Sequence, residues 1–246
     1  MSDLVKTEAI VLSKINYGDT SSIVSFYTES EGKLSAIAKG SRSPKSKIGK
    51  ILDPLNHLQI IIYKKNTRDV QILSGADLIS HFTKIKEELI ATKFAFAVIE
   101  LIKNLTADDE ENKKLFKGII KILNLLEDKT EHPSVLFTRF FLFLIAELGY
   151  DLTIDKCGIC SKQITSNSTI GFNQERGFVC VDCFRSQIGL EIISTELFNY
   201  VICLKTNRKI SEMNLELIEK LNILLESYLK IHIPDFKGIQ SFQIYR

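Results

Sequence analysis

Over the first 80 residues, apolar and polar positions follow the pattern of short β-strands. Five runs rich in β-branched or aromatic residues occur at 9–12, 23–27, 34–38, 58–63 and 70–73. Turn-forming residues separate the first three runs, at 16–19 and 29–32. Because no helix-length segment interrupts the five runs, the pattern predicts a small β-barrel. An OB-type barrel, which has five strands, is the best match, and an SH3-like barrel is the alternative that the pattern leaves open.

The apolar spacing changes near residue 80 to that of amphipathic helices. Between Ile85 and Ile102, apolar side chains recur every three or four residues, which predicts a helix. The acidic run 108–111 suits the positive end of a second helix dipole, so we expect this helix to start there and to end near Leu126. The boundary between the β part and the helical part rests on this change of period alone.

A third helix is predicted from Pro133 to Gly149, since proline is favoured in the first helical turn. Its side chains are apolar on nearly every face, which indicates the buried centre of a helical bundle. Two further helices are expected after the cysteine-containing region, near 194–204 and 215–231.

Four of the five cysteines form two C-x-x-C pairs, Cys157 with Cys160 and Cys180 with Cys183. Nineteen residues separate the pairs, which matches the spacing of four-cysteine zinc sites. Four thiolates complete a tetrahedral shell, so we expect one structural zinc ion with no open position for catalysis. A redox dithiol and four incidental cysteines are the alternatives, although the βαβ context of a thioredoxin-like motif is absent. Cys203 stands alone in a predicted helix and is expected to lie in the core.

Together these patterns predict an α+β chain of two domains. A five-stranded OB-type β-barrel would cover residues 1–80, and an all-α bundle domain would cover 81–246. The second domain would carry the four-cysteine zinc-binding insert at about 154–186, in which Gly171 and Gly177 flank a predicted β-hairpin.

The composition of the 246 residues is that of a globular protein. The chain has 45 % apolar and 25 % charged residues, which excludes the disordered and fibrous classes. The N-terminus lacks the apolar segment of a signal peptide. The most apolar stretch, 140–146, is far shorter than the roughly 20 residues that a membrane span needs. We therefore expect a cytoplasmic protein whose cysteines are reduced and available for metal.

The formal net charge is only +2, but its distribution is uneven. Residues 33–68 carry nine Lys or Arg and one acid, a net charge of +8, so the rest of the chain carries −6. Within this region, the segment 39–50 holds five cations, no acid and many turn-forming residues. A flexible cationic loop suits contact with phosphate, and a solubilising loop is the alternative. The expected DNA-contact residues are Lys33, Lys39, Arg42, Lys45, Lys47 and Lys50, with Arg176 of the hairpin as a weaker candidate.

Aromatic side chains on the predicted barrel could add base stacking. Tyr17, Tyr27 and Tyr63 lie on or beside its strands, although each is equally suited to the core or the rim. Recognisable catalytic residues are absent, since the four histidines lie in unrelated segments and no P-loop, HExxH or GxSxG motif occurs. We therefore expect a protein that is not an enzyme. A nuclease site made of dispersed carboxylates is the alternative that a sequence pattern would miss.

Three stretches of the chain resemble the RecO family of bacterial DNA repair proteins. The most specific is residues 31–47, EGKLSAIAKGSRSPKSK, which is similar to the N-terminal barrel of that family. The stretch that starts at Arg139 and leads into Cys157 resembles the family's central helix entering its zinc knuckle. Residues 236–241 resemble the closing segment, but Gly238-Ile-Gln-Ser stands where the family commonly has Leu-Lys-Ser. The resemblance runs over essentially the whole chain.

This resemblance implies a non-catalytic recombination mediator of the RecF pathway, with an OB-fold domain, a helical domain and a zinc-binding insert. Such a protein binds single- and double-stranded DNA and anneals complementary strands. With RecR and the single-stranded-DNA-binding protein, SSB, it helps to load RecA. It would act in the bacterial cytoplasm, at the nucleoid. The alternative function is a zinc-stabilised scaffold that docks partners without direct DNA contact.

The resemblance also implies a site for the C-terminal tail of SSB, which is acidic and ends in an apolar residue. Such a tail needs a cationic rim over a hydrophobic pocket. Arg139, beside the Phe-rich third helix, is the candidate for this rim. The simpler alternative is that Arg139 only caps an edge of the helical bundle.

Overall fold

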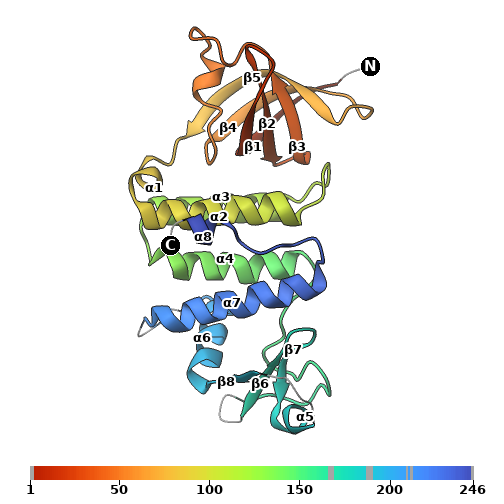
Figure 1. Cartoon of the computed structure of the whole chain (residues 1–246), viewed down its shortest axis with the longest axis vertical. Helices are drawn as coiled ribbons and strands as arrows, with labels where there is room; N and C mark the ends of the chain where they lie inside the picture. The colour runs from red at the N-terminus through yellow and green to blue at the C-terminus, as the bar shows by residue number, and fades with distance from the viewer. Residues whose placement is uncertain (1–2, 166–168, 187–190, 209, 211–212, 245–246) are drawn as a thin grey trace. The chain divides into compact units, whose positions relative to one another are not determined.

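The structure is a computed structural model that describes residues 3–165, 169–186, 191–208, 210 and 213–244. Its packing divides the chain into two compact units, 1–129 with 240–246 and 130–239. The first unit contains the β-barrel with helices α1, α2, α3 and α8, and the second contains α4 to α7 with a small sheet (Figure 1). The expected division into a barrel domain 1–80 and a helical domain 81–246 stays a prediction.

The N-terminal strands close into a barrel, as the alternating pattern predicted. The strands are β1 (Asp3–Tyr17), β2 (Ser21–Thr28), β3 (Gly32–Ala38), β4 (His57–Lys64) and β5 (Val70–Ser80). They follow the order β1-β2-β3-β5-β4, in which β3 and β5 are parallel, and the pairs β1–β2, β2–β3, β4–β5 and β1–β4 are antiparallel. In β3, the strictly alternating burial turns Leu34, Ala36 and Ala38 inward. The prediction of a five-stranded OB-type barrel is confirmed.

One of the tyrosines proposed for base stacking is buried. Tyr27 is 1 % exposed, and burial, with a smaller contribution from Glu110, raises its pKa to about 12. Its ring is therefore covered and is not available to a base. Tyr17 and Tyr63 are exposed, so both stay candidates for stacking.

Three helices and a short C-terminal turn complete the first unit. They are α1 (Thr83–Glu87), α2 (Leu89–Leu105), α3 (Lys113–Glu127) and α8 (Ser241–Ile244). The helix expected over 85–102 is interrupted, because Glu88 has an extended backbone between α1 and α2. The prediction that the next helix begins with an acidic first turn is wrong. Asn112 caps α3 through Leu115 N, and the run 108–111 precedes the helix because two of its acids pair with barrel lysines.

The end of the chain returns to the first unit. The Glu100 carboxylate on α2 accepts hydrogen bonds from the backbone N–H groups of Gln240 and Ser241, at 2.6 and 2.8 Å. The ring of Phe242 packs edge-on against Phe94, with 5.5 Å between centroids. The last described residues are thus fixed against α2 although the family-like Leu-Lys-Ser triplet is missing.

The second unit is a helical bundle with a small β-structure. Its elements are α4 (Pro133–Glu147), β6 (Ile170–Asn173), β7 (Gly177–Cys180), α5 (Val181–Arg185), β8 (Glu191–Ile193), α6 (Thr195–Lys205) and α7 (Leu215–His232). As predicted, Pro133 opens α4, whose side chains are buried on nearly every face, and α7 packs along it (Figure 1). Among the described residues, the helices are all too short or too polar to cross a bilayer.

Candidate metal centre and nucleic-acid interface

The four paired cysteines converge at one point of the second unit. Cys157 and Cys160 lie in a turn, Cys180 ends β7, and Cys183 lies on α5. Their four sulfur atoms lie within 4.8 Å of one another, and the Sγ atoms of Cys160 and Cys180 are 3.6 Å apart. Tetrahedral zinc–thiolate bonds of about 2.3 Å place sulfurs about 3.8 Å apart. The residues present therefore fit a metal ion held by four thiolates.

Backbone hydrogen bonds shape this cluster. The Cys180 N–H donates to Cys157 Sγ at 3.3 Å, and the Gly158 N–H donates to the Phe178 carbonyl at 2.9 Å. A Cβ at position 158 would lie 1.9 Å from the carbonyl oxygen of Arg176, so the first knuckle needs glycine there. The predicted hairpin of β6 and β7 is present, and its exposed turn carries Arg176.

The electrostatics of the cluster favour a thiolate at one cysteine. Burial acts to raise the pKa of the Cys157 thiol, but hydrogen bonds from the backbone N–H groups of Cys160, Cys180 and Ile159 outweigh it and lower this pKa to about 6. A thiolate is the form that binds metal. Cys203 lies outside the cluster on α6 and is half-buried, so its expected place in the core is only partly realised.

The basic loop, residues 39–50, connects β3 toward β4 on the barrel. All five of its cations have exposed side chains, namely Lys39, Arg42, Lys45, Lys47 and Lys50. The Arg42 guanidinium donates to the Gly18 carbonyl at 2.9 Å, which ties the basic loop to the β1–β2 turn. For the other four cations, the described residues provide no ion-pair partner. These ammonium groups are therefore accessible to phosphate.

Close backbone contacts hold the basic loop in a defined shape. Gly49, in the short helix η1 (Ile48–Lys50), packs so tightly that a Cβ would lie 1.7 Å from the Ser41 carbonyl oxygen. The Ser46 hydroxyl accepts a hydrogen bond from the Gly49 N–H at 3.1 Å. The basic loop thus presents its cations from an ordered backbone rather than from an unstructured linker.

Lys33 lies apart from the other proposed DNA contacts. Its ammonium donates to the carbonyls of Lys103 and Thr106 at 2.9 and 2.6 Å and pairs with Asp108 at 3.3 Å. The side chain is only 16 % exposed. Its ammonium is thus already occupied by acceptors at the end of α2 and just after it. The amino-acid composition does not show these contacts.

Two barrel cations were missed by the sequence-based choice of residues. Lys65 and Arg68 lie in the exposed β4–β5 loop, one of the loops through which OB folds bind oligonucleotides. The buried side chain of Gln71 shapes this loop by accepting from Lys65 N and donating to the Lys65 and Arg68 carbonyls. Both cations belong to the basic region 33–68. The charge pattern together with the predicted strand ends, which place both residues in a loop, could have identified them.

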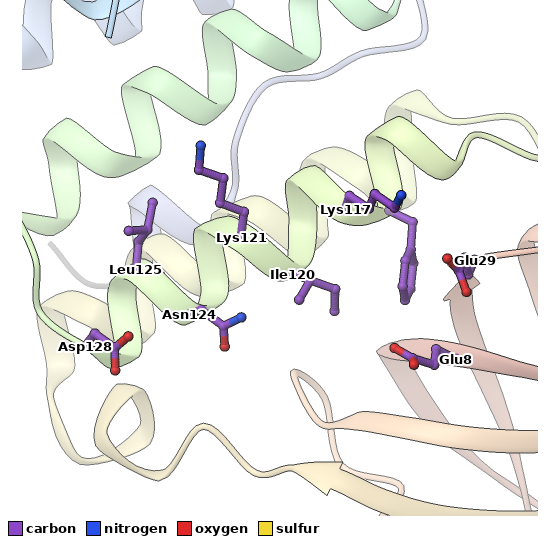
Figure 2. Close-up of a pocket in the computed structure, with 9 residues that line it drawn as sticks. Glu8, Glu29, Lys117, Ile120, Lys121, Asn124, Leu125 and Asp128 are labelled. Carbon is purple, nitrogen blue, oxygen red and sulfur yellow. The ribbon is translucent and has the colours of Figure 1, made fainter. Parts of the chain in front are cut away.

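A groove of about 470 Å³ lies between the barrel and α3. Figure 2 shows Glu8 and Glu29 on the barrel side and Ile120 and Asn124 on the α3 side. Acidic and basic side chains both line it, since Lys117 of α3 lies there together with Glu8 and Glu29. A groove with both signs of charge does not select a polyanion, so it adds nothing to the nucleic-acid interface.

Arg139, the residue proposed for partner binding, is largely covered. Its side chain is 14 % exposed, and its Nη2 donates to the Arg208 carbonyl at 2.9 Å and lies 3.4 Å from Glu131 Oε2. Its Nε is buried and has no acceptor among the described residues. Within the described part of the chain, the guanidinium thus keeps one unsatisfied donor, while Glu131 partly neutralises its charge.

Comparison with known proteins assigns the chain to a family. The model for "Recombination protein O N terminal" matches residues 1–82, and that for "Recombination protein O C terminal" matches residues 86–238. The chain belongs to the RecO family. It is 32 % identical to the DNA repair protein RecO of Chloroherpeton thalassium over 98 % of this chain and 97 % of that protein. It is 26 % identical to RecO of Alkaliphilus metalliredigens, with 98 % of both chains covered. RecO membership supports a role in DNA repair and recombination.

Proposed function

We propose that this RecO-family chain is a non-catalytic mediator of recombination in the RecF pathway. In this proposal it binds single- and double-stranded DNA through its barrel and anneals complementary strands at the bacterial nucleoid. With RecR, it helps to load RecA onto DNA coated by SSB. A zinc-stabilised scaffold that docks partners without touching DNA is the second candidate, and the four-cysteine cluster is the observation in its favour.

The observation that carries the mediator proposal is the set of accessible cations on an OB-type barrel. Lys39, Lys45, Lys47 and Lys50 are exposed, and no carboxylate of the described residues pairs with them. Cations in this state can neutralise phosphates and release the counterions that surround DNA, which makes binding favourable and dependent on salt. Lys33 can contact DNA only after its ammonium breaks its present contacts with the Lys103 and Thr106 carbonyls and with Asp108.

The test is binding of a fluorescent single-stranded oligonucleotide by anisotropy over a salt series. We expect replacement of Lys39, Lys45, Lys47 and Lys50 by Ala to weaken binding and to make the salt dependence shallower. Each lost phosphate contact should reduce the slope of log K against log salt by about 0.7. Arg42 is kept in this variant because its guanidinium also supports the fold of the basic loop.

The matched control removes four exposed lysines elsewhere, Lys84, Lys103, Lys156 and Lys237, so that both variants lose the same net charge. The proposal requires the control to keep most of the wild-type slope. Equal losses in both variants would mean that only net charge matters and that the basic loop is no interface. Absence of any salt-dependent binding by the wild type would leave the scaffold as the better function.

For the cysteine cluster, we propose one structural zinc ion bound by Cys157, Cys160, Cys180 and Cys183. The convergence of the four sulfur atoms supports this choice. Four protein ligands would leave no position for water, so the ion would hold the hairpin and α5 together rather than take part in a reaction.

For the SSB tail, we propose Arg139 as the cation that receives a tail carboxylate in exchange for Glu131. Arg139 lies on the Phe-rich α4, and its buried Nε, which has no acceptor among the described residues, supports the proposal because an additional acceptor would satisfy it. We expect Arg139→Ala to weaken binding of a tail peptide about tenfold, since a hydrogen bond to a charged group contributes about 1.5 kcal/mol. Titration of a fluorescent tail peptide measures this.

Arg208→Ala is the matched control for the tail experiment. The Arg208 side chain is exposed, and only its backbone carbonyl contacts Arg139. This variant should therefore bind the tail peptide like the wild type. If Arg139→Ala also retains wild-type affinity, Arg139 only closes an edge of the bundle and the tail binds elsewhere.

A further inference from the structure

An acidic segment, residues 107–111, lies against the barrel within the first unit. It follows α2 and includes Asp108, Asp109, Glu110 and Glu111. The Asp109 N–H donates to the Lys33 carbonyl at 2.9 Å, and Lys33 and Asp108 form a parallel β-bridge. The acidic segment is therefore paired with the barrel through its backbone as well as through its charges.

The turn between β2 and β3 is adapted to this contact. Gly32 has φ +64, and a Cβ there would lie 2.1 Å from the Glu110 carbonyl oxygen. Only glycine allows this approach. Asp109 itself has φ +56, a left-handed conformation that Asp and Asn adopt more readily than most residues. The local sequences on both sides thus permit the acidic segment to reach the barrel surface.

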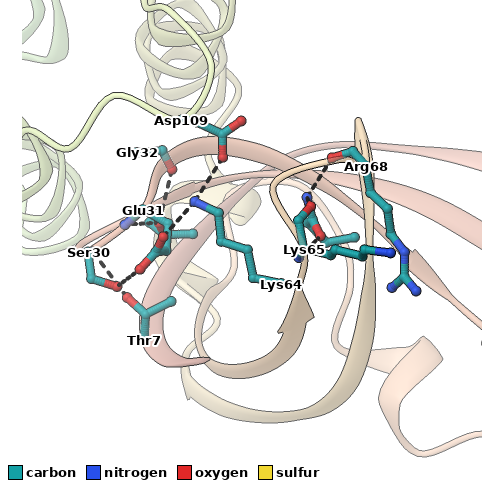
Figure 3. A network of polar contacts seen from close by, with 10 residues as sticks. Thr7, Ser30, Glu31, Gly32, Lys64, Lys65, Arg68 and Asp109 are labelled. Carbon is teal, nitrogen blue, oxygen red and sulfur yellow. Dashed lines mark hydrogen bonds and ion pairs between the residues drawn. The ribbon is translucent and has the colours of Figure 1, made fainter. Parts of the chain in front are cut away.

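The charges of the acidic segment are directed at two barrel lysines. Lys64 Nζ lies between Glu31 Oε2 at 2.7 Å and Asp109 Oδ1 at 3.0 Å, as Figure 3 shows. Burial acts to lower the pKa of Lys64, but hydrogen bonds to these two carboxylates outweigh it and raise this pKa. Lys33 pairs with Asp108 in the same way. Both ammonium groups thus hold carboxylates where a phosphate oxygen would otherwise bind.

The position of this contact relates it to nucleic acid. Lys64 directly precedes the β4–β5 loop with its exposed Lys65 and Arg68, which Figure 3 draws beside the network. This loop is one of the oligonucleotide-binding loops of OB folds. Glu31 of the β2–β3 turn by itself balances the ammonium of Lys64, so the addition of Asp109 from the acidic segment gives this group a net negative charge that repels phosphate.

We propose that the acidic segment 107–111 is an intramolecular competitor of DNA, which occupies Lys33 and Lys64 until a phosphate backbone displaces it. The inference rests on the proposed DNA-binding function and adds a phosphate-binding pair and its regulation. The carboxylates are suited to exchange because they are mostly open to solvent, with Asp109 53 % and Asp108 75 % exposed, whereas the lysines beneath them are nearly covered.

The test compares Asp109→Asn with Asp77→Asn in oligonucleotide binding by the full chain. Asn is isosteric and tolerates the left-handed backbone, so the fold should persist. Asp77 is an exposed barrel residue on β5 and provides an equal change of net charge. One additional phosphate contact raises affinity about fivefold at 0.1 M salt, because the slope gains about 0.7. We expect this gain for Asp109→Asn and a smaller change without a steeper slope for Asp77→Asn.

A second variant separates the position of the acidic segment from its charge. Gly32→Ala keeps every carboxylate but obstructs the approach of Glu110, so it should also tighten DNA binding. Hydrogen exchange gives a direct readout, because the Asp109 amide is bonded to the Lys33 carbonyl. Saturating oligonucleotide should speed exchange at Asp109 in the wild-type protein.

The outcomes distinguish this inference from the proposed function. If the wild type shows no salt-dependent binding, the DNA-binding function itself is wrong. If the wild type binds, but Asp109→Asn behaves like Asp77→Asn and the Asp109 amide stays protected with DNA, the acidic segment is only a structural tie and the competitor model is overturned.

Discussion

Replacement of Cys180 by Ser is expected to release the metal ion and to unfold the β-structure around it. Cys180 is buried, ends β7 and supplies one of the four clustered thiolates, so its replacement removes a ligand while the backbone N–H that donates to Cys157 Sγ stays in place. The hairpin strands have only four residues each, too few for stability on their own. Structural zinc contributes about 10 kcal/mol or more to the folding of small zinc domains, so we expect a change of several kcal/mol in the second unit.

Two measurements check this result. Metal analysis of the purified protein should find one zinc per wild-type chain and none in Cys180→Ser, and thermal unfolding should begin at a lower temperature. The matched control is Cys203→Ser. Because Cys203 lies outside the cluster, this variant should bind as much zinc as the wild type. A Cys180→Ser protein with a full complement of zinc and an unchanged melting curve would contradict the proposed metal centre.

Phe178→Ala is expected to have the second largest effect. Phe178, on β7, is 1 % exposed and packs edge-on against Phe172 and Phe198, with centroids 5.3 and 5.1 Å away. Since Phe198 lies on α6, this ring joins the hairpin to the helical bundle. Truncation of a buried Phe leaves a cavity and lowers the free energy of unfolding by about 3–5 kcal/mol.

Denaturant unfolding of the zinc-loaded protein measures this loss. The control is Ile159→Ala, which removes an exposed apolar side chain between two of the cysteines and should change stability by less than about 0.5 kcal/mol. Zinc content should stay at the wild-type value in both variants, because Phe178 donates no ligand. An equally small effect of Phe178→Ala would mean that the hairpin does not depend on α6 for its stability.

Much of the fold could be predicted because its signals are local. The alternation of Leu34, Ala36 and Ala38 identifies a strand without knowledge of its neighbours. Pro133 and the apolar run behind it identified α4 in the same way. The spacing of the cysteines predicted their convergence, since two intervening residues turn both thiolates toward one point.

Two predictions made from short stretches of sequence were wrong, because contacts with residues far away in the chain decided the structure. Charge near a helix dipole favoured a helix start at Asp108, but pairing with Lys33 and Lys64 on the barrel holds this part of the chain outside the helix. Tyr27 has the residue type of a stacking platform, and only the tertiary packing, which brings Glu110 near it, shows that its ring is buried. Both errors arise because ion pairs and burial depend on residues far away in the sequence.

The sequence by itself determined the five strands, the main helices, the four-cysteine cluster and the excess of cations over residues 33–68, because each depends on residue types at short spacing. The tertiary structure decided which cations are accessible. Lys39 and Lys45 are open to solvent, whereas carboxylates that are distant in sequence cover Lys33 and Lys64. The formal charge of a lysine follows from its type, but its availability to DNA depends on which acceptors the fold brings to its ammonium.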